Sequence, residues 1–293
     1  MSEPTLTILA IPKPFIGHIG IIQRNAITSW TKLRPRPEIY LFGEEEGVAE
    51  IAAELGLHHT DIARSKFGTP MLDDLMRRGC EFARTPLVGY INSDIIVLQE
   101  CLDAVVNVHK KFPKFLAVAY RANIDLTEAL DFETDGETKL RQEILPAMAP
   151  GCETGIDVFF FPPKTYPDVP AFAIGRGWFD QWFIQDARRR NVPVVDLTSV
   201  ARAIHQNHEY RHVPGGLQAA LYGEEAQGNL ALYGGVPHSS SLLDATHELL
   251  PNGAVRPVRF RRERAALRGW LWKTLIQPTA GLRTRLGLHR NSV

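Results

Sequence analysis

The stretch LVGYINSDIIVL (residues 87–98) places three polar side chains between two apolar runs. The apolar halves are typical of buried β-strands, and Asn92, Ser93 and Asp94 lie where the first strand ends. A carboxylate is costly to bury unless it is paired, hydrogen-bonded or bound to a metal. Asp94 therefore belongs either to an Asx turn between the strands or to a cation site. Other motifs of the chain distinguish between the two.

Apolar strands and amphipathic helices alternate around this stretch. Strands are expected at residues 5–12, 38–42, 86–92, 94–98 and 115–121, and helices at about 21–33, 48–55, 70–83 and 100–111. Thr69 is expected to cap the third helix ahead of Pro70, and Gly56 to end the second. The alternation predicts an α/β fold, a mostly parallel central sheet with helices on both faces.

The second half of the chain is expected to complete this sheet. It holds a polar insertion with a weak helix near residues 137–145, strands at 155–163, 171–174, 193–197 and 200–205, and a helix at about 178–190. Residues 213–241 are rich in Gly, Ala and Ser, so we expect loops and a short helix that cover a site. Residues 1–250 are expected to form one domain, with halves at about 1–121 and 151–215, and residues 251–293 a basic amphipathic helical tail.

The bulk composition is that of a soluble globular protein. Of 293 residues, 44% are hydrophobic and 23% are charged. An apolar run of about 18 residues is absent, so no transmembrane helix is expected, and the first residues do not resemble a signal peptide. Cys80, Cys101 and Cys152 lack metal-binding spacing, which favours reduced thiols in a cytoplasmic protein.

The formal net charge of zero conceals an asymmetry. Residues 256–290 carry ten Lys or Arg and one acid, Glu263, a net +9, so the rest of the chain sums to −9. Arginines interleaved with Trp270 and Trp272 are typical of a helix that binds an anionic membrane surface. The alternative is a helix that packs on the acidic body. Nucleic acid is not an expected partner, because that body is acidic and shows no binding motif.

The segment IHQNHEYRHV (residues 204–213) places His205, His208 and His212 after an apolar strand. Neutral imidazole is a good ligand for Mn²⁺ or Zn²⁺. These side chains could complete a carboxylate site contributed by a distant strand, or they could be ordinary surface or core histidines. A closed zinc site of these histidines alone is a less favoured interpretation, because no local cysteine completes it.

The segment GRGWFDQWF (residues 175–183) places Asp180 in the first turn of an expected helix, among aromatic residues. An acid at this position often only complements the helix dipole. The functional alternative is a partly dehydrated carboxylate with a raised pKa, suited to act as a general base. Arg176 could contact a phosphate, or simply end a strand. Polar groups that follow several strands are expected to meet at one edge of the sheet.

In this combination and order, the chain resembles the GT-A-fold glycosyltransferases of the family-2-like group, which use nucleotide-diphospho-sugar donors. The segments that carry the resemblance span roughly residues 5–215 and are TILAIPKPF, QRNAITSW, EIYLFGEEEGV, FGTPML, VGYINSDIIVL, GIDVFFFP, AIGRGWFDQWF and IHQNHEYRHV. The Asn-Ser-Asp triplet is similar to the Asp-x-Asp motif of that family, with Asn92 in place of the first acid.

The resemblance implies a role for each of these positions. Asp94 would bind Mn²⁺ or Mg²⁺, with His205 or His208 as a further ligand, and Asp180 would deprotonate the acceptor hydroxyl. Donor contacts are expected from Pro12, Lys13, Glu44, Glu45, Lys66, Asn92, Ser93 and Arg176. Acceptor contacts are expected from Asp157, Trp178 and Trp182.

The implied activity is transfer of a sugar from a nucleotide sugar to a hydroxyl of a glycan or lipid-linked glycan, metal-assisted and inverting, in polysaccharide biosynthesis. The expected location is cytoplasmic, and the tail allows a peripheral position at the inner face of the membrane. A sugar-phosphate nucleotidyltransferase is an alternative, although IPKPFIGHIG lacks the Gly-rich basic loop of such enzymes. A non-catalytic carbohydrate-binding protein is another, although it would not need Asp94, Asp180 and the histidines together. A hydride cofactor is not implied, because no G-x-G-x-x-G follows the first strand.

Overall fold

The computed structural model describes residues 3–147, 155–208, 216–234, 240–259, 261, 263 and 265–267. The chain divides into a compact unit of residues 1–257 and a second unit of residues 258–293. In the second unit, residues 261, 263 and 265–267 are helical. The predicted basic tail lies mostly outside the described residues, and its Trp270 and Trp272 lie wholly outside them.

Among the described residues, no helix has both the length and the apolar character needed to cross a bilayer.

The first unit alternates strands and helices along the sequence. Its described strands are β1 (Leu6–Ala10), β2 (Glu38–Phe42), β3 (His58–Thr60), β4 (Leu87–Ile91), β5 (Ile95–Ile96), β6 (Leu116–Ile124), β7 (Ile156–Phe161), β8 (Val194–Asp196), β9 (Ala203–Gln206), β10 (His247–Leu249) and β11 (Val255–Pro257). Its described α-helices are α1 (Gly17–Thr31), α2 (Val48–Leu55), α3 (Leu72–Phe82), α4 (Gln99–His109), α5 (Gly136–Lys139), α6 (Phe179–Arg189), α7 (Gly216–Tyr222) and α8 (Glu224–Tyr233). A π-helical turn, η1 (Leu140–Ile144), and two 3₁₀ turns, η2 (Leu145–Ala147) and η3 (Leu242–Asp244), complete the set.

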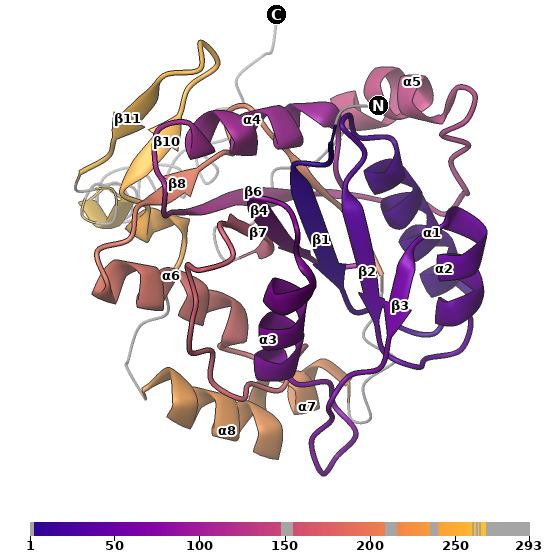
Figure 1. The fold of residues 1–293 in the computed structure, drawn as a ribbon, viewed down its shortest axis with the longest axis horizontal. Helices are drawn as coiled ribbons and strands as arrows, with labels where there is room; N and C mark the ends of the chain where they lie inside the picture. Colours follow the sequence, from indigo (N-terminus) through magenta and orange to yellow (C-terminus); the bar gives the residue numbers. More distant parts are fainter. Residues whose placement is uncertain are drawn as a thin grey trace, which may run out of the picture. The chain divides into compact units, whose positions relative to one another are not determined.

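The strands form one central sheet in the order β11-β10-β8-β6-β7-β4-β1-β2-β3, with β5 and β9 joined beside β6 (Figure 1). Strands β3, β2, β1 and β4 run parallel to one another, while β7 runs antiparallel between β4 and β6. The predicted α/β class with a largely parallel sheet is therefore confirmed. The antiparallel β7 brings its amino end to the edge where β1 and β4 end.

Alternate residues of each central strand pack into two separate cores, one on each face of the sheet. In β1, Ile8 joins the core that contains Trp30 of α1 and residues of α2 and α4. Its neighbour Leu9 joins the opposite core, with Met76 of α3 and Phe183 of α6. Side chains of a strand point alternately to opposite faces, so an unbroken apolar run is what a sheet covered on both sides requires.

Several predicted elements differ from the structure. Helix α1 begins at residue 17 rather than 21, because its first turn, GHIG, lacks the apolar spacing from which the helix was predicted. Helix α3 begins at Leu72, and Thr69 does not cap it, since the Thr69 hydroxyl donates instead to Glu225. Residues 171–174 do not form a strand; only an isolated bridge joins Ala173 to Met71.

The region of residues 213–241 contains more helix than predicted. Two consecutive helices, α7 and α8, occupy most of its described part. Strands β3, β10 and β11 are absent from the prediction, because each has only three residues; β3 and β11 are the two edge strands, and β10 lies next to β11. The predicted stop of α2 at Gly56 is confirmed by its left-handed conformation, φ 63°.

The close approach of α3 to the sheet depends on a glycine. A Cβ atom at Gly79 would lie 2.2 Å from Leu9 Cδ1, whereas a Cβ at Gly228 in α8 would meet open space. We expect Gly79→Ala to lower the free energy of unfolding by roughly 1–3 kcal/mol through overpacking. The matched control Gly228→Ala should raise it by up to about 1 kcal/mol, because alanine is the better helix former. Urea unfolding of wild type and of the two variants measures both effects. Equal changes in the free energy of unfolding of the two variants would contradict the close contact between Gly79 and Leu9.

Candidate functional site

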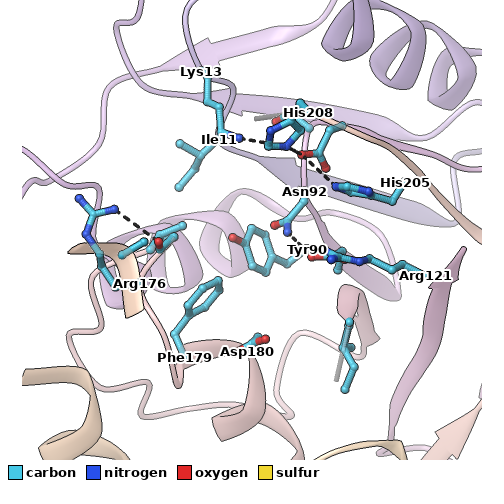
Figure 2. Close-up of a pocket in the computed structure, with 18 of the residues that line it drawn as sticks. Ile11, Lys13, Tyr90, Asn92, Arg121, Arg176, Phe179, Asp180, His205 and His208 are labelled. Carbon is cyan, nitrogen blue, oxygen red and sulfur yellow. Dashed lines mark hydrogen bonds and ion pairs between the residues drawn. The ribbon is translucent and has the colours of Figure 1, made fainter. Parts of the chain in front are cut away.

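A cavity of about 410 Å³ opens at the edge of the sheet where β1 and β4 end (Figure 2). Its walls come from the loop after β1, the turn after β4, the start of β7, the amino end of α6, strand β9 with its following residues, and α7. Segments far apart in the sequence thus contribute side chains to one space. This is the edge at which open α/β sheets commonly bind ligands.

The upper wall in Figure 2 carries a carboxylate between two imidazoles. His208 Nε2 lies 2.9 Å from Asp94 Oδ2, and His205 Nε2 lies 4.0 Å from the same oxygen. One potential ligand atom from each of these three residues lies within 4.8 Å of the others. Lys13 Nζ approaches His208 Nε2 at 3.5 Å. Carboxylate oxygen and imidazole nitrogen converge here, a combination suited to a divalent transition metal.

Buried backbone contacts place this cluster. Strand β5 pairs with β9 so that Ile95 lies opposite His205. The indole of Trp30 in α1 donates to the Ile95 carbonyl oxygen at 2.9 Å, and the Gln206 amide donates to the Asp94 carbonyl oxygen at 3.1 Å. Both anchoring side chains are buried. The backbone of Asp94 is therefore fixed against α1 and β9 before any ligand binds.

A second buried amide holds the loop after β1. Gln23 in α1 accepts from the Lys13 backbone N–H at 2.6 Å and donates to the Lys13 carbonyl oxygen at 2.8 Å. This two-point contact fixes the peptide of Lys13 while its side chain extends toward the imidazoles. The ammonium group is thus positioned by the body of the helix.

The charges of the cluster are strongly coupled. Burial alone would raise the pKa of the Asp94 carboxyl, but the hydrogen bond with His208 and the charge of Lys13 hold that pKa far below its usual range. Burial lowers the pKa of Lys13, and the charge of Asp94 opposes this shift. Burial also lowers the pKa of His205. Asp94 is ionised and His205 tends toward its neutral, metal-binding form at neutral pH.

Two buried atoms of the cluster lack a hydrogen-bond partner among the described residues. They are Asp94 Oδ1 and His205 Nδ1. Such orphaned polar atoms are rare in a folded interior and call for a ligand, an ion or water. Together with the donor set, they make Asp94, His205 and His208 fit a divalent cation.

The opposite wall carries Asp180, in the first turn of α6. Burial and the nearby charge of Asp157 raise the pKa of Asp180 to about 7, against hydrogen bonds from the backbone N–H groups of Gln181 and of Asp180 itself. In Figure 2 the ring of Tyr90 is drawn between this carboxyl and the imidazoles, and the ring of Phe179 is drawn to one side of it. A carboxyl poised near neutral pH beside apolar rings is suited to accept a proton.

A third acid, Asp157, lies at the start of β7, and both of its oxygens are occupied. Asn92 Nδ2 donates to Asp157 Oδ1 at 2.7 Å, and Arg121 donates to Asp157 Oδ2 at 3.2 Å. Burial raises the pKa of Asp157, and the charge of Arg121 opposes that shift. Asp157 is therefore held in place in the cavity wall, and each of its oxygens can still accept a second hydrogen bond.

Arg176 reaches the cavity wall but is held from the side. Its Nε donates to Glu225 Oε2 at 3.0 Å, and its second terminal nitrogen donates to Thr69 Oγ1 at 3.0 Å. Glu225 also accepts from Ser65 and Thr69, at 2.5 and 2.7 Å. This Glu225 cluster (Ser65, Thr69, Arg176 and Glu225) ties α8 to two loops beside the site.

Ten of the predicted site residues line the cavity together. They are Lys13, Asn92, Ser93, Asp94, Asp157, Arg176, Trp178, Asp180, His205 and His208. Pro12, Glu44, Glu45 and Lys66 lie outside its lining. Glu45 pairs with Arg64 at 2.7 Å, and Lys66, whose side chain is 72% exposed, pairs with Glu224.

Trp182 requires a correction. It was expected to contact an acceptor, but it is only 5% exposed and lies outside the cavity lining. Its ring packs against Tyr166 and Phe172 in the core between α6 and the sheet. Trp182 lies on the inner face of α6, whereas Trp178 precedes the helix with a left-handed backbone, φ 82°, and lines the cavity.

The sequence prediction missed several lining residues. Arg121, Tyr90 and Gln23 contribute polar groups, and Ile11, Ile19, Ile22, Phe179, Ala220 and Leu221 contribute apolar surface. Arg121 carried a signal, a single charge within an apolar strand. Gln23 carried none, because a buried glutamine in a helix is recognised only from its partners.

No protein-family model and no curated protein matches the chain. Among solved structures, the chain is similar to TarS 1–349 of S. aureus in complex with UDP-GlcNAc, with a TM-score of 0.47 and 10% identity over 72% of this chain and 61% of that one. It is also similar to glucosyl-3-phosphoglycerate synthase of Mycobacterium tuberculosis in complex with Mn²⁺, UDP and phosphoglyceric acid, with a TM-score of 0.48 and 16% identity over 80% of each chain. The chain spans less than two thirds of the TarS chain. Both similarities are distant in sequence and in backbone geometry.

Proposed function

We propose that the chain is a GT-A-type glycosyltransferase that moves a sugar from a nucleotide-sugar donor to an acceptor hydroxyl. One observation carries the proposal: a single cavity holds a cation-binding cluster, Asp94 with His205 and His208, on one wall and the poised carboxyl of Asp180 on another. Such a transfer needs positive charge beside a departing diphosphate and a base beside an incoming hydroxyl. We assign the first role to the Asp94 cluster with Lys13 and the second to Asp180.

In this proposal Asp94, His205 and His208 hold Mn²⁺, which supplies positive charge to the diphosphate of the donor. A protonated Lys13 adds a further positive charge on the same wall. Asn92 and Ser93 adjoin the donor. The Asp180 carboxylate accepts the proton of the acceptor hydroxyl as its oxygen bonds to the anomeric carbon and the bond from that carbon to the diphosphate breaks. One such displacement inverts the anomeric configuration.

The rings that line the cavity serve positioning and exclusion of water. Trp178 adopts a left-handed conformation, φ 82°, which is uncommon for a residue with a side chain. This conformation directs its ring to the cavity rim, where it contacts Tyr233 at 5.3 Å between ring centroids. We propose that Trp178 stacks on the acceptor sugar. Pro12, Glu44, Glu45 and Lys66 remain proposed donor contacts, for parts of the donor that extend beyond the cavity.

A donor panel tests the proposal. Binding of UDP-, GDP-, CDP- and dTDP-sugars is measured with Mn²⁺, with Mg²⁺ or with a chelator. We expect one donor class to bind more tightly when a metal is present. The gain in affinity should be at least tenfold larger with Mn²⁺ than with Mg²⁺, because two of the three metal ligands are nitrogens. Asp94→Ala should abolish the metal effect, and the surface control Asp168→Ala should not. Calorimetry measures each affinity. Equal donor binding without metal and in Asp94→Ala would refute the assigned role, and pyrophosphate release from nucleotide triphosphate and sugar phosphate would favour a nucleotidyltransferase.

The raised pKa of Asp180 predicts a pH dependence. Because the base must be ionised, kcat should rise with pH through about 7, and Asp180→Asn should lower it by roughly 10²–10⁴-fold. An acid with a raised folded-state pKa destabilises the fold as pH rises through that pKa, so Asp180→Asn should be more stable than wild type at pH 8 by roughly 1–3 kcal/mol, and equal to it near pH 3. Initial rates and thermal unfolding across pH measure both, with Asp168→Asn as control. A flat rate profile would contradict the role.

We further propose that residues 1–250, with the sheet continuing through β11 to Pro257, form the transferase domain, and that the remainder of the predicted tail of residues 251–293 holds a cytoplasmic enzyme at an anionic membrane surface, near a glycan or lipid-linked acceptor. The support is the sequence of the tail, with net +9 over residues 256–290. The full chain should sediment with phosphatidylglycerol vesicles but not with phosphatidylcholine vesicles. Trp270→Ala with Trp272→Ala should reduce this binding about tenfold. Binding that is equal on both vesicle types would argue against the tail as an anchor.

A further inference from the structure

Asn92 and Asp157 face each other across an antiparallel ladder. Strands β4 and β7 pair with Ile91 opposite Val158, and the ladder continues with the Asn92 backbone N–H donating to the Asp157 carbonyl oxygen at 3.1 Å. Side chains of directly opposed residues lie on the same face of a sheet, about 5 Å apart at Cβ. The pairing of the strands therefore places the side chain of residue 92 next to the carboxylate of residue 157.

This contact determines how the Asn92 amide is turned. The amide presents its nitrogen to Asp157, because Asn92 Nδ2 donates to Asp157 Oδ1 at 2.7 Å. Since the amide is planar, Oδ1 of Asn92 then lies on the far side, toward the cavity. In Figure 2 a dashed line marks the bond from the Asn92 nitrogen, and the remainder of this side chain borders the open space.

The other oxygen of Asp157 is held by Arg121. The bond of 3.2 Å anchors the carboxylate from the side opposite Asn92, and Asp157 itself is buried. Asp157 is therefore a fixed acceptor between two donors. It cannot turn away to accommodate a different residue at position 92.

An aspartate at position 92 would place two carboxylates at hydrogen-bond distance in a buried site. Like charges so close and so poorly solvated are strongly unfavourable. Asparagine keeps an oxygen at this position and replaces the repulsion by a hydrogen bond. The first position of the Asn-Ser-Asp triplet is thus constrained by a residue 65 positions later in the chain.

We propose that Asp157 is a positioning residue that makes asparagine the required residue at position 92 and directs its Oδ1 into the cavity as a neutral oxygen donor for the cation and donor. This rests on the proposed function for what occupies the cavity, but the pairing itself does not. Asn92 therefore provides an oxygen in place of the first acid of an Asp-x-Asp motif, and the acid of the Asn92–Asp157 pair lies in β7.

Three variants test the proposal: Asn92→Asp, Asp157→Asn and the exchange that combines them. At pH 8, Asn92→Asp should lower the ratio of folded to unfolded protein at least tenfold, measured by urea unfolding. The exchange restores one carboxylate and one amide, so it should recover most of this loss. Asn207→Asp is a matched control, because Asn207 pairs with Asp125 at 2.8 Å near the surface, and it should change the ratio less than threefold.

A second measurement reports the direction of the side chain. The exchange turns a carboxylate oxygen at position 92 to the cavity, so the doubly substituted protein should bind Mn²⁺ at least tenfold more tightly than wild type, by electron paramagnetic resonance without nucleotide. The proposal would be overturned if Asn92→Asp were as stable as wild type, or if the doubly substituted protein were no more stable than Asn92→Asp alone. It would also be overturned if the doubly substituted protein recovered its stability but bound Mn²⁺ no more tightly than wild type. A wild type that binds no Mn²⁺ or donor would instead refute the proposed function, and the unfolding data would still decide the pairing.

Discussion

The site depends on two hydrogen bonds from Gln206 to the carbonyl oxygen of Asp94, one from its backbone N–H at 3.3 Å and one from its side chain at 3.1 Å. The same buried amide donates to Ile22 in α1 and accepts from Asn25. Leaving such a group unpaired in the interior costs roughly 1–3 kcal/mol, so these partners are satisfied only when α1, β9 and the turn after β4 are in register. His205 and His208 flank Gln206 and are brought to Asp94 by the same register. Assembly of the cluster is therefore part of folding.

Three carboxylates share the cavity and occupy three different environments. Asp94 accepts a hydrogen bond from an imidazole and has a lowered pKa, Asp157 is fixed between an amide and a guanidinium, and Asp180 has a raised pKa beside aromatic rings. Identical side chains thus differ in charge at neutral pH because of their surroundings alone. The lowered pKa of Asp94 keeps that group charged, while the raised pKa of Asp180 lets the second carboxyl of the same cavity exchange a proton near neutral pH.

Much of this arrangement is predictable from the sequence, and the failures have physical causes. Apolar runs identify the central strands because both faces of the sheet are covered, and polar residues at strand ends converge because parallel strands end at one edge. The pairing of Asn92 with Asp157 is not visible locally, since it requires β7 to run antiparallel between β4 and β6. The orientation of Trp182 depends on the phase of α6, which is set where the helix begins. Helix α8 has little amphipathic pattern, so its Gly- and Ala-containing sequence indicated loops.

The Glu225 cluster has a consequence for how such a protein can diversify. Helices α7 and α8 lie beside the cavity, α7 in its lining, and a wall of this kind is a natural place to vary the molecule that is recognised. Glu225 on α8 accepts from Ser65 and Thr69 as well as Arg176, so its partners lie in segments that precede it by about 160, 156 and 49 residues. The two helices cannot be exchanged as an independent module. A graft that omits Glu225 would leave Arg176 without its carboxylate partner, so recombination in this region must preserve contacts between distant parts of the chain.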